Sequence, residues 1–206
     1  DMGAGKGYLT FALYDYLHNK LKKKPKVLGI ELRSELVEKC NAIVEKAKFD
    51  HLSFEQGAIK EVVLPKIDVL MALHACDIAT DDAIARGIKD QAKVILAAPC
   101  CHKQIRNSMK NQGSLAALTK FGIMEARQAE ILTDTIRALI LESYGYKTKV
   151  FEFIATDHTP KNILIAAVKT KEIELPDPII KEQITTLKET FGISFHELER
   201  LMEIKN

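Results

Sequence analysis

Asp1-Met-Gly-Ala-Gly-Lys-Gly-Tyr-Leu9 is the stretch of sequence that decides the fold. Its three glycines follow the spacing G-x-G-x-G, and a segment with helical periodicity begins directly after them. Glycines at a strand-to-helix turn allow a tight bend and let the backbone approach a ligand closely. The dinucleotide-binding fingerprint has a third glycine where Tyr8 stands, and the phosphate-binding loop has Ser or Thr where Gly7 stands. Neither motif fits, so the stretch predicts a ligand-binding turn of a different kind.

The next predicted strand, Lys26-Val-Leu-Gly-Ile-Glu31, ends on a carboxylate. In nucleotide-binding sheets, an acidic residue about 20 residues beyond the glycine turn holds the ribose. A carboxylate can accept hydrogen bonds from two vicinal hydroxyls together, which is what a ribose presents. We therefore expect Glu31 to bind a ribose, and Ser34 to cap the helix that follows.

The glycine turn and Glu31 together closely resemble the cofactor-binding segment of the class I S-adenosylmethionine-dependent methyltransferases. The motif of that family usually opens with an acidic residue, which is Asp1 here. The resemblance implies S-adenosyl-L-methionine as cofactor, with its methionine and ribose at the glycine turn and its adenine beside Ala58 or Ile59. The cofactor-binding residues that it implies are Asp1, Gly3, Gly5, Gly7, Glu31, Ala58, Ile59 and His74.

Strand-like and helical segments alternate along the rest of the chain, which predicts an α/β fold with a Rossmann-like, doubly wound, mostly parallel sheet. The last two predicted strands form a hairpin, so one antiparallel strand is expected near the C-terminal end of the sheet. The glycine turn should follow an apolar strand, and we therefore expect the first strand to lie upstream of Asp1. Residues 1–170 are expected to form the N-terminally incomplete methyltransferase domain, and residues 171–206 a C-terminal helical extension. The predicted strands are 27–31, 52–56, 67–73, 93–98, 147–154 and 162–168. The predicted helices are 9–21, 34–47 and 124–144, a helix that begins at Thr80-Asp81-Asp82, and two short helices between 179 and 204.

Composition indicates a globular domain. The 206 residues are 47% hydrophobic and 28% charged, which does not indicate a disordered chain or a membrane protein. No apolar run in the sequence is long enough to span a membrane. The four cysteines do not have the spacing of a disulfide framework, so a reducing, cytoplasmic location is expected. A net charge of +2 neither requires nor excludes a nucleic-acid partner.

Two unusual motifs follow the predicted strands at 67–73 and 93–98: His74-Ala-Cys-Asp77 and Pro99-Cys-Cys-His102. Ligands of such sheets bind beyond the carboxyl ends of the strands, where both motifs lie. Many amine methyltransferases have an Asp/Asn-Pro-Pro-aromatic motif in the place that His74-Ala-Cys-Asp77 occupies after the strand at 67–73, and this chain lacks it. The pair of motifs resembles instead a branch of methyltransferase-like proteins that are often suspected of RNA modification.

Three chemical interpretations of these motifs stay open, besides the simple one that the cysteines are small buried residues. A carboxylate or imidazole could act as general base or orient the acceptor atom. The thiols could add to a pyrimidine ring, as in the RNA cytosine-5 methyltransferases. The cysteines and histidines could also hold zinc, but adjacent cysteines are not the usual C-x2-C chelate, and we assign no metal ligand from the sequence. The candidate catalytic residues are His74, Asp77, Cys100, Cys101 and His102.

The predicted hairpin tip, Asp157-His-Thr-Pro-Lys-Asn162, is the candidate substrate-binding loop, through His158, Lys161 and Asn162. Ordinary turn chemistry explains its Asp, Pro and Asn equally well. The expected function is methyl transfer from S-adenosyl-L-methionine to a macromolecule, with RNA as first choice. A protein or small-molecule acceptor, a catalytically silent S-adenosylmethionine-binding module and a nicotinamide dehydrogenase are the alternatives, and the oligomeric state is left open.

Overall fold

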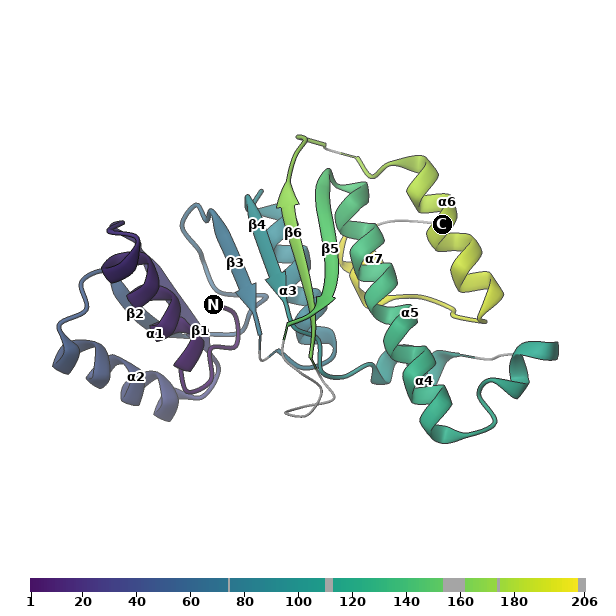
Figure 1. Cartoon of the computed structure of the whole chain (residues 1–206), viewed down its shortest axis with the longest axis horizontal. Coiled ribbons are helices and arrows are strands. Elements are labelled where there is room, and N and C mark those ends of the chain that lie inside the picture. Colours follow the sequence, from purple (N-terminus) through teal and green to yellow (C-terminus); the bar gives the residue numbers. More distant parts are fainter. Residues whose placement is uncertain (74, 110–112, 154–161, 174, 204–206) are drawn as a thin grey trace.

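The computed structural model describes residues 1–73, 75–109, 113–153, 162–173 and 175–203. Its strands form two sheets, one of order β1-β2 and one of order β3-β4-β6-β5 (Figure 1). The pairs β1–β2 and β3–β4 are parallel, whereas β6 runs antiparallel to both β4 and β5. This confirms the mostly parallel Rossmann-like sheet with an antiparallel strand near the C-terminal end. The strands are β1 (Val27–Glu31), β2 (Leu52–Gln56), β3 (Val69–Ala72), β4 (Val94–Ala97), β5 (Tyr146–Glu152) and β6 (Ile163–Lys169).

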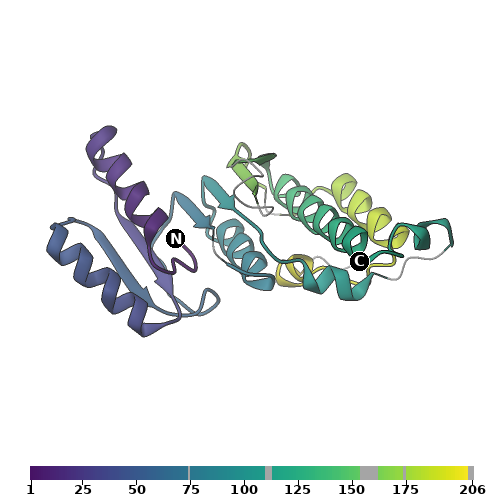
Figure 2. The same ribbon diagram turned by 60° about the horizontal axis from the view of Figure 1, so that its bottom comes forward.

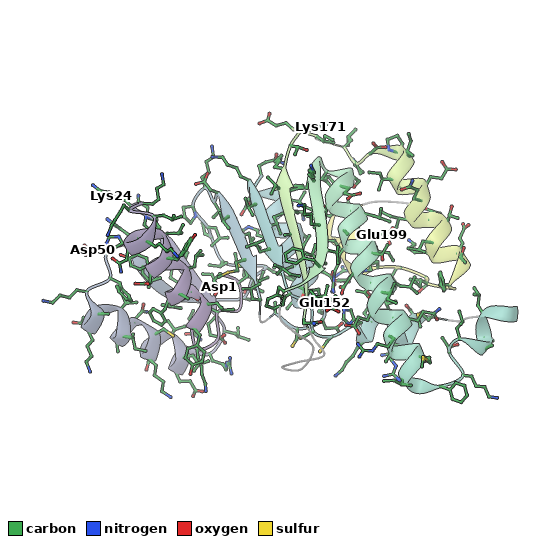
Figure 3. All side chains as sticks on the ribbon, viewed as in Figure 1. Asp1, Lys24, Asp50, Glu152, Lys171 and Glu199 are labelled. Carbon is green, nitrogen blue, oxygen red and sulfur yellow. The ribbon has the colours of Figure 1, made fainter. Side chains whose placement is uncertain are left out.

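The first two residues join the two sheets. Met2 forms a parallel bridge with Ile30 of β1, and its amide donates a 2.7 Å hydrogen bond to the Met71 carbonyl of β3. On the β1 side, the Ile30 amide donates to the Asp1 carbonyl at 2.8 Å. Asp1 accordingly lies between the two groups of strands, as its label in Figure 3 shows. The glycine turn therefore starts in the centre of the strand order.

Helices cover the strands on both sides, and Figure 2 shows α1 and α2 on opposite sides of β1 and β2. One buried cluster on β1 and β2 is centred on Tyr14 and Phe54. A larger one joins β3, β4 and β6 to the later helices, through Ile95, Ile136 and Leu198 among others. The helices are α1 (Tyr8–Asp15), the π-helical turn η1 (Tyr16–Lys20), α2 (Ser34–Ala47), α3 (Ile78–Lys89), α4 (Lys103–Ser108), the 3-10 turn η2 (Gly113–Ala117), α5 (Gly122–Ser143), α6 (Pro178–Thr190) and α7 (Glu197–Leu201).

Several local predictions are wrong. Ser34 is the first residue of α2 rather than its cap; Arg33 holds the N-cap position, without a side-chain cap bond. Helix α3 begins two residues before Thr80, whose hydroxyl donates to the Ala75 carbonyl at 2.7 Å and so closes the preceding loop. On α5, Leu132, Ile136 and Ile140 are buried in the core, whereas Ile131 is 67% exposed. Helix α4 and the turn η2 have no predicted counterpart.

The carboxyl ends of three strands lie on one side of the sheet. Strands β3 and β4 end at the lower side in Figure 1, and Glu152 at the end of β5 lies on the same side in Figure 3. Lys24, in the turn before β1, and Lys171 lie on the opposite side, remote from the carboxyl ends of β3 and β4 (Figure 3). None of the helices in the described ranges combines the length and apolar character needed to cross a membrane.

Candidate active site

A pocket of about 470 Å³ lies at the carboxyl ends of β1, β2 and β3. Four segments line it: the glycine turn, the end of β1 with the residues after it, the loop at 57–60 after β2, and residues between 75 and 82 after β3. These segments were expected to converge, because the carboxyl ends of parallel strands meet at one edge. Of the sequence-predicted cofactor residues, the pocket brings together Gly3, Gly5, Glu31, Ala58 and Ile59.

The three glycines of the turn have different tasks, although all have positive φ. A Cβ on Gly5 (φ +60°) would have no neighbour closer than 4.0 Å, and Gly3 and Gly5 both line the pocket. A Cβ on Gly7 (φ +73°) would lie 2.9 Å from Cζ of Phe54 and 3.0 Å from a ring carbon of Phe11. Gly5 thus leaves space for a ligand, whereas Gly7 leaves space for the aromatic core and is not part of the pocket lining.

Glu31 is 7% exposed at the end of β1 and accepts hydrogen bonds on both carboxylate oxygens. Oε2 accepts from the Gly5 amide at 2.9 Å, and Oε1 accepts from the amide and Nε of Arg33 at 3.1 and 2.9 Å. Burial would raise the pKa of Glu31, but the hydrogen bonds from Arg33 and Gly5 outweigh it and hold the pKa below its usual range. The pocket therefore contains an ionised carboxylate at neutral pH.

Arg33 is a site residue that the sequence did not indicate. Its side chain is 60% exposed and forms an ion pair with Glu31 across the pocket edge. Because only the guanidinium is exposed to solvent, it can move into water and leave the Glu31 carboxylate to accept hydrogen bonds from vicinal hydroxyls of a ligand.

On the far side of the pocket, Ala58 and Ile59 offer an apolar wall after β2. Lys60 and Asp82 close this side with an ion pair of 3.2 Å. Burial raises the pKa of Asp82, against the opposing effect of Lys60. Neither residue was singled out from the sequence, because a Lys–Asp pair on unconnected segments leaves no local pattern.

Asp1 supports the turn rather than lining the pocket. Its carboxylate accepts a 2.6 Å hydrogen bond from the hydroxyl of Thr10, a fully buried residue of α1. This contact ties the start of the turn to the helix that follows it, so Asp1 acts on the shape of the pocket through the backbone.

Three thiols gather beside the pocket, at the ends of β3 and β4. The Sγ atoms of Cys76 and Cys100 are 3.0 Å apart, and those of Cys100 and Cys101 are 3.7 Å apart. Cys76 is exposed and lines the pocket. Burial, together with the neighbouring thiols, raises the pKa of Cys100 to about 12. A lone Cys100 thiol is therefore a weak nucleophile at neutral pH, which disfavours its addition to a pyrimidine ring.

His102 and Asp77 lie behind the pocket and not on its lining. The Nε2 atom of His102, which is 7% exposed, is 3.2 Å from Oδ2 of Asp134 on α5. Asp77 precedes α3 with a strained φ of +52°, and its carbonyl accepts a 3.1 Å hydrogen bond from Arg137. Arg137 also pairs with Asp81 at 2.8 Å and with Asp134 at 3.1 Å. This buried network joins the two loops that carry the thiols to α3 and α5.

Asn162, just before β6, is buried and lines a separate hollow beside α5 rather than this pocket. His74, His158 and Lys161 lie outside the described residues.

Comparisons with known proteins agree with this geometry. The profile of a family described as a methyltransferase domain matches residues 1–108, which include the whole pocket. No curated protein sequence matches the chain.

Solved structures with similar folds are distant in sequence. The methyltransferase domain of the bacterial protein CtHen1-C has 13% identity and a TM-score of 0.53, covering 82% of this chain and 87% of its own. A dimethyladenosine transferase from Plasmodium falciparum has 15% identity and a TM-score of 0.49, covering 92% of this chain and 61% of its own. A SAM-dependent methyltransferase from Aquifex aeolicus has 15% identity and a TM-score of 0.43, covering 80% and 77%. At such identities, the likeness to the first of these supports the fold alone.

Proposed function

The chain belongs to the methyltransferase domain family, and from that premise we propose that it methylates a macromolecular acceptor, RNA in the first place. The cofactor of the family is S-adenosyl-L-methionine, which supplies an electrophilic methyl group on a sulfonium. The observation that carries the proposal is the pocket itself, which sets an open glycine turn opposite an ionised Glu31, with an exposed rim at Cys76.

The residues of the pocket fit this cofactor. Glu31 has the charge and position to accept hydrogen bonds from both ribose hydroxyls when the Arg33 side chain moves away from its carboxylate. The space over Gly5 admits the methionine part, and the wall of Ala58 and Ile59 suits the adenine ring. Methyl transfer is an in-line displacement, so the contribution of these residues is mainly to hold the reacting groups in position.

The acceptor side supports a large substrate. Cys76 is exposed and Cys100 and Cys101 are half-buried, so among the described residues this rim of the pocket faces solvent. Lys103, at the start of α4 and two residues after Cys101, is exposed, and such a side chain is a usual partner of phosphates; Arg106 on the same helix is exposed but pairs with Glu125 at 2.9 Å. The resemblance of the two cysteine motifs to suspected RNA-modifying proteins points the same way. The cysteines, all free thiols, support a cytoplasmic location as part of the proposal.

The test is transfer of a radiolabelled methyl group from S-adenosyl-L-methionine to fractionated cell extract from a strain that lacks the protein. We expect label in the RNA fraction that nuclease releases and protease does not. Label that only protease releases would show that the acceptor is a protein and not RNA. Label in the small-molecule fraction would show that it is a small molecule. Tight cofactor binding by calorimetry with no label in any fraction would indicate a catalytically silent binding module.

A further inference from the structure

Three thiols form a group of their own at the rim of the pocket, which one of them, Cys76, also lines. The Sγ atoms of Cys76, Cys100 and Cys101 all lie within 4.8 Å of one another. They come from two loops, the first after β3 and the second after β4, so the sheet itself brings them together (Figure 1). Because parallel strands end at one edge, the convergence is a property of the fold and not of a single flexible loop.

From this group we infer a zinc site, with Cys76, Cys100 and Cys101 as the three protein ligands. Thiolates held about 2.3 Å from a tetrahedral zinc ion lie about 3.8 Å apart. The separation of 3.7 Å between Cys100 and Cys101 fits this value, and the pair of Cys76 and Cys100, at 3.0 Å, needs to open by less than 1 Å. Sulfur ligands select zinc over calcium or magnesium, which prefer oxygen.

A disulfide explains the group less well. A bond between Cys76 and Cys100 would use two thiols and leave Cys101, whose sulfur is also turned toward Cys100. In the sequence, the adjacent cysteines argued against a chelate because they do not have the usual C-x2-C spacing. In the structure, Cys100 and Cys101 lie in the loop beyond the end of β4 at Ala97, and both sulfurs are near that of Cys76.

The fourth ligand of the ion is not among the residues that the structure describes. His102 was the candidate nearest in sequence, but its Nε2 faces Asp134 in the buried network. No other His, Cys, Asp or Glu of the described ranges joins the three thiols. The described residues therefore supply three of the four ligands of a tetrahedral zinc ion.

The place of the site gives the ion a task. Cys76 lines the cofactor pocket, so the group lies between that pocket and the solvent on the acceptor side. A zinc ion there can bind an oxygen, nitrogen or sulfur of the acceptor and lower its pKa, which helps an acceptor that must lose a proton. The inference does not depend on RNA as the acceptor, because the ligand set is the same for any of them.

The experiment measures metal content in the chain purified without chelators or an affinity tag that binds metal. Inductively coupled plasma mass spectrometry should find about one zinc ion per chain. Cys76→Ser, Cys100→Ser and Cys101→Ser should each lose the ion. Cys40→Ser is the matched control and should retain the ion. Cys40 is buried in α2, in the cluster with Tyr14 and Phe54, and is not part of the thiol group.

A second measurement guards against variants that fold poorly. Cobalt(II) added to the metal-free wild-type chain should give the charge-transfer absorption of thiolate-bound cobalt, and zinc should abolish it. Purified protein without zinc and without a cobalt spectrum would overturn the inference, as would zinc retained by all three variants. A Cys76–Cys100 disulfide in non-reducing peptide mapping of metal-free protein from a reducing cell would assign the thiols a redox role instead.

Discussion

At the scale of single residues, the pocket depends on one charge and one missing side chain. Glu31 is ionised because its hydrogen bonds outweigh its burial, and Gly5 is open because no atom occupies the place of its Cβ. Both residues line the pocket, whereas Gly7 leaves room for the ring of Phe54. Substitutions at these positions should therefore separate cofactor binding from stability.

Replacing Glu31 by Gln should weaken the binding of S-adenosyl-L-methionine by about 10- to 100-fold, because hydrogen bonds to a charged group contribute about 1.5 to 3 kcal/mol. Isothermal titration calorimetry measures the change. Glu35→Gln, on the exposed surface of α2, is the matched control and should bind like wild type. Equal affinities for the two variants would remove Glu31 from the cofactor site.

Replacing Gly5 or Gly7 by Ala should have opposite main effects. Both variants carry the strain of a left-handed conformation, about 1 to 2 kcal/mol. Gly5→Ala adds a methyl group to the pocket and should lower cofactor affinity more than stability. Gly7→Ala forces the rings of Phe54 and Phe11 apart and should lower the melting temperature further. Calorimetry and thermal unfolding of both variants test this, and identical profiles would contradict the division of roles.

At the scale of the elements, a buried charge network holds the loops of the acceptor side. Arg137, on α5 and 1% exposed, contacts Asp81 on α3, the Asp77 carbonyl and Asp134, which in turn faces His102. Asp77 and Asp81 are more than 50 residues away along the chain, whereas Asp134 lies one turn away on α5, so the start of α3 is fixed by α5 and not by a local turn. The network thus gives His102 and Asp77 a positioning role.

Arg137→Met should lower the free energy of unfolding by about 3 to 5 kcal/mol, because it leaves buried carboxylates without a counter-charge. Urea denaturation measures this loss. The control is Arg127→Met on the same helix: the Arg127 side chain is 52% exposed and pairs with Glu130 at 3.1 Å, so its loss should cost less than that of the 1% exposed Arg137.

The loss in free energy of unfolding that Arg137→Met causes should also grow as the pH rises. Burial raises the pKa of Asp81, and Arg137 opposes this effect, so removing Arg137 raises that pKa further. A group whose pKa is raised on folding is most favourable to the folded state below its unfolded pKa and loses that benefit as the pH rises through the folded value. The variant should therefore lie closer to wild type at about pH 5 than at about pH 8. A deficit that shrinks with pH would contradict the assignment.

At the scale of the whole molecule, the C-terminal helices belong to the same core as the sheet. Ile184 of α6 and Leu198 of α7 are in the larger buried cluster, together with Ile95 of β4. Helix α6 packs beside α5 and α7 beside α3. The predicted boundary at residue 170 stays a prediction, but the packing gives the residues beyond it a part in stabilising the domain.

Leu198→Ala should lower the free energy of unfolding by about 2 to 5 kcal/mol, because it opens a cavity in a fully buried position. Ile179→Ala on α6 is the control, since Ile179 is 67% exposed. Chemical denaturation with two independent probes measures both variants. If unfolding of Leu198→Ala becomes biphasic, with the sheet unchanged, the C-terminal helices form a separate cooperative unit.

The sequence by itself determined the order of strands and helices, the glycine turn, and the role expected of Glu31. These follow from local rules: apolar periodicity, the positive φ that glycine allows, and the spacing between a turn and the next strand. The predicted helix caps at Ser34 and Thr80 were wrong: Ser34 lies inside α2, and the Thr80 hydroxyl donates to the Ala75 carbonyl instead of capping α3. Only the tertiary structure decided that Cys76 meets Cys100, that His102 turns to Asp134, and that Arg33 and Lys60 join the pocket. Such contacts join segments tens of residues apart, and burial and charge pairing in the folded core select them.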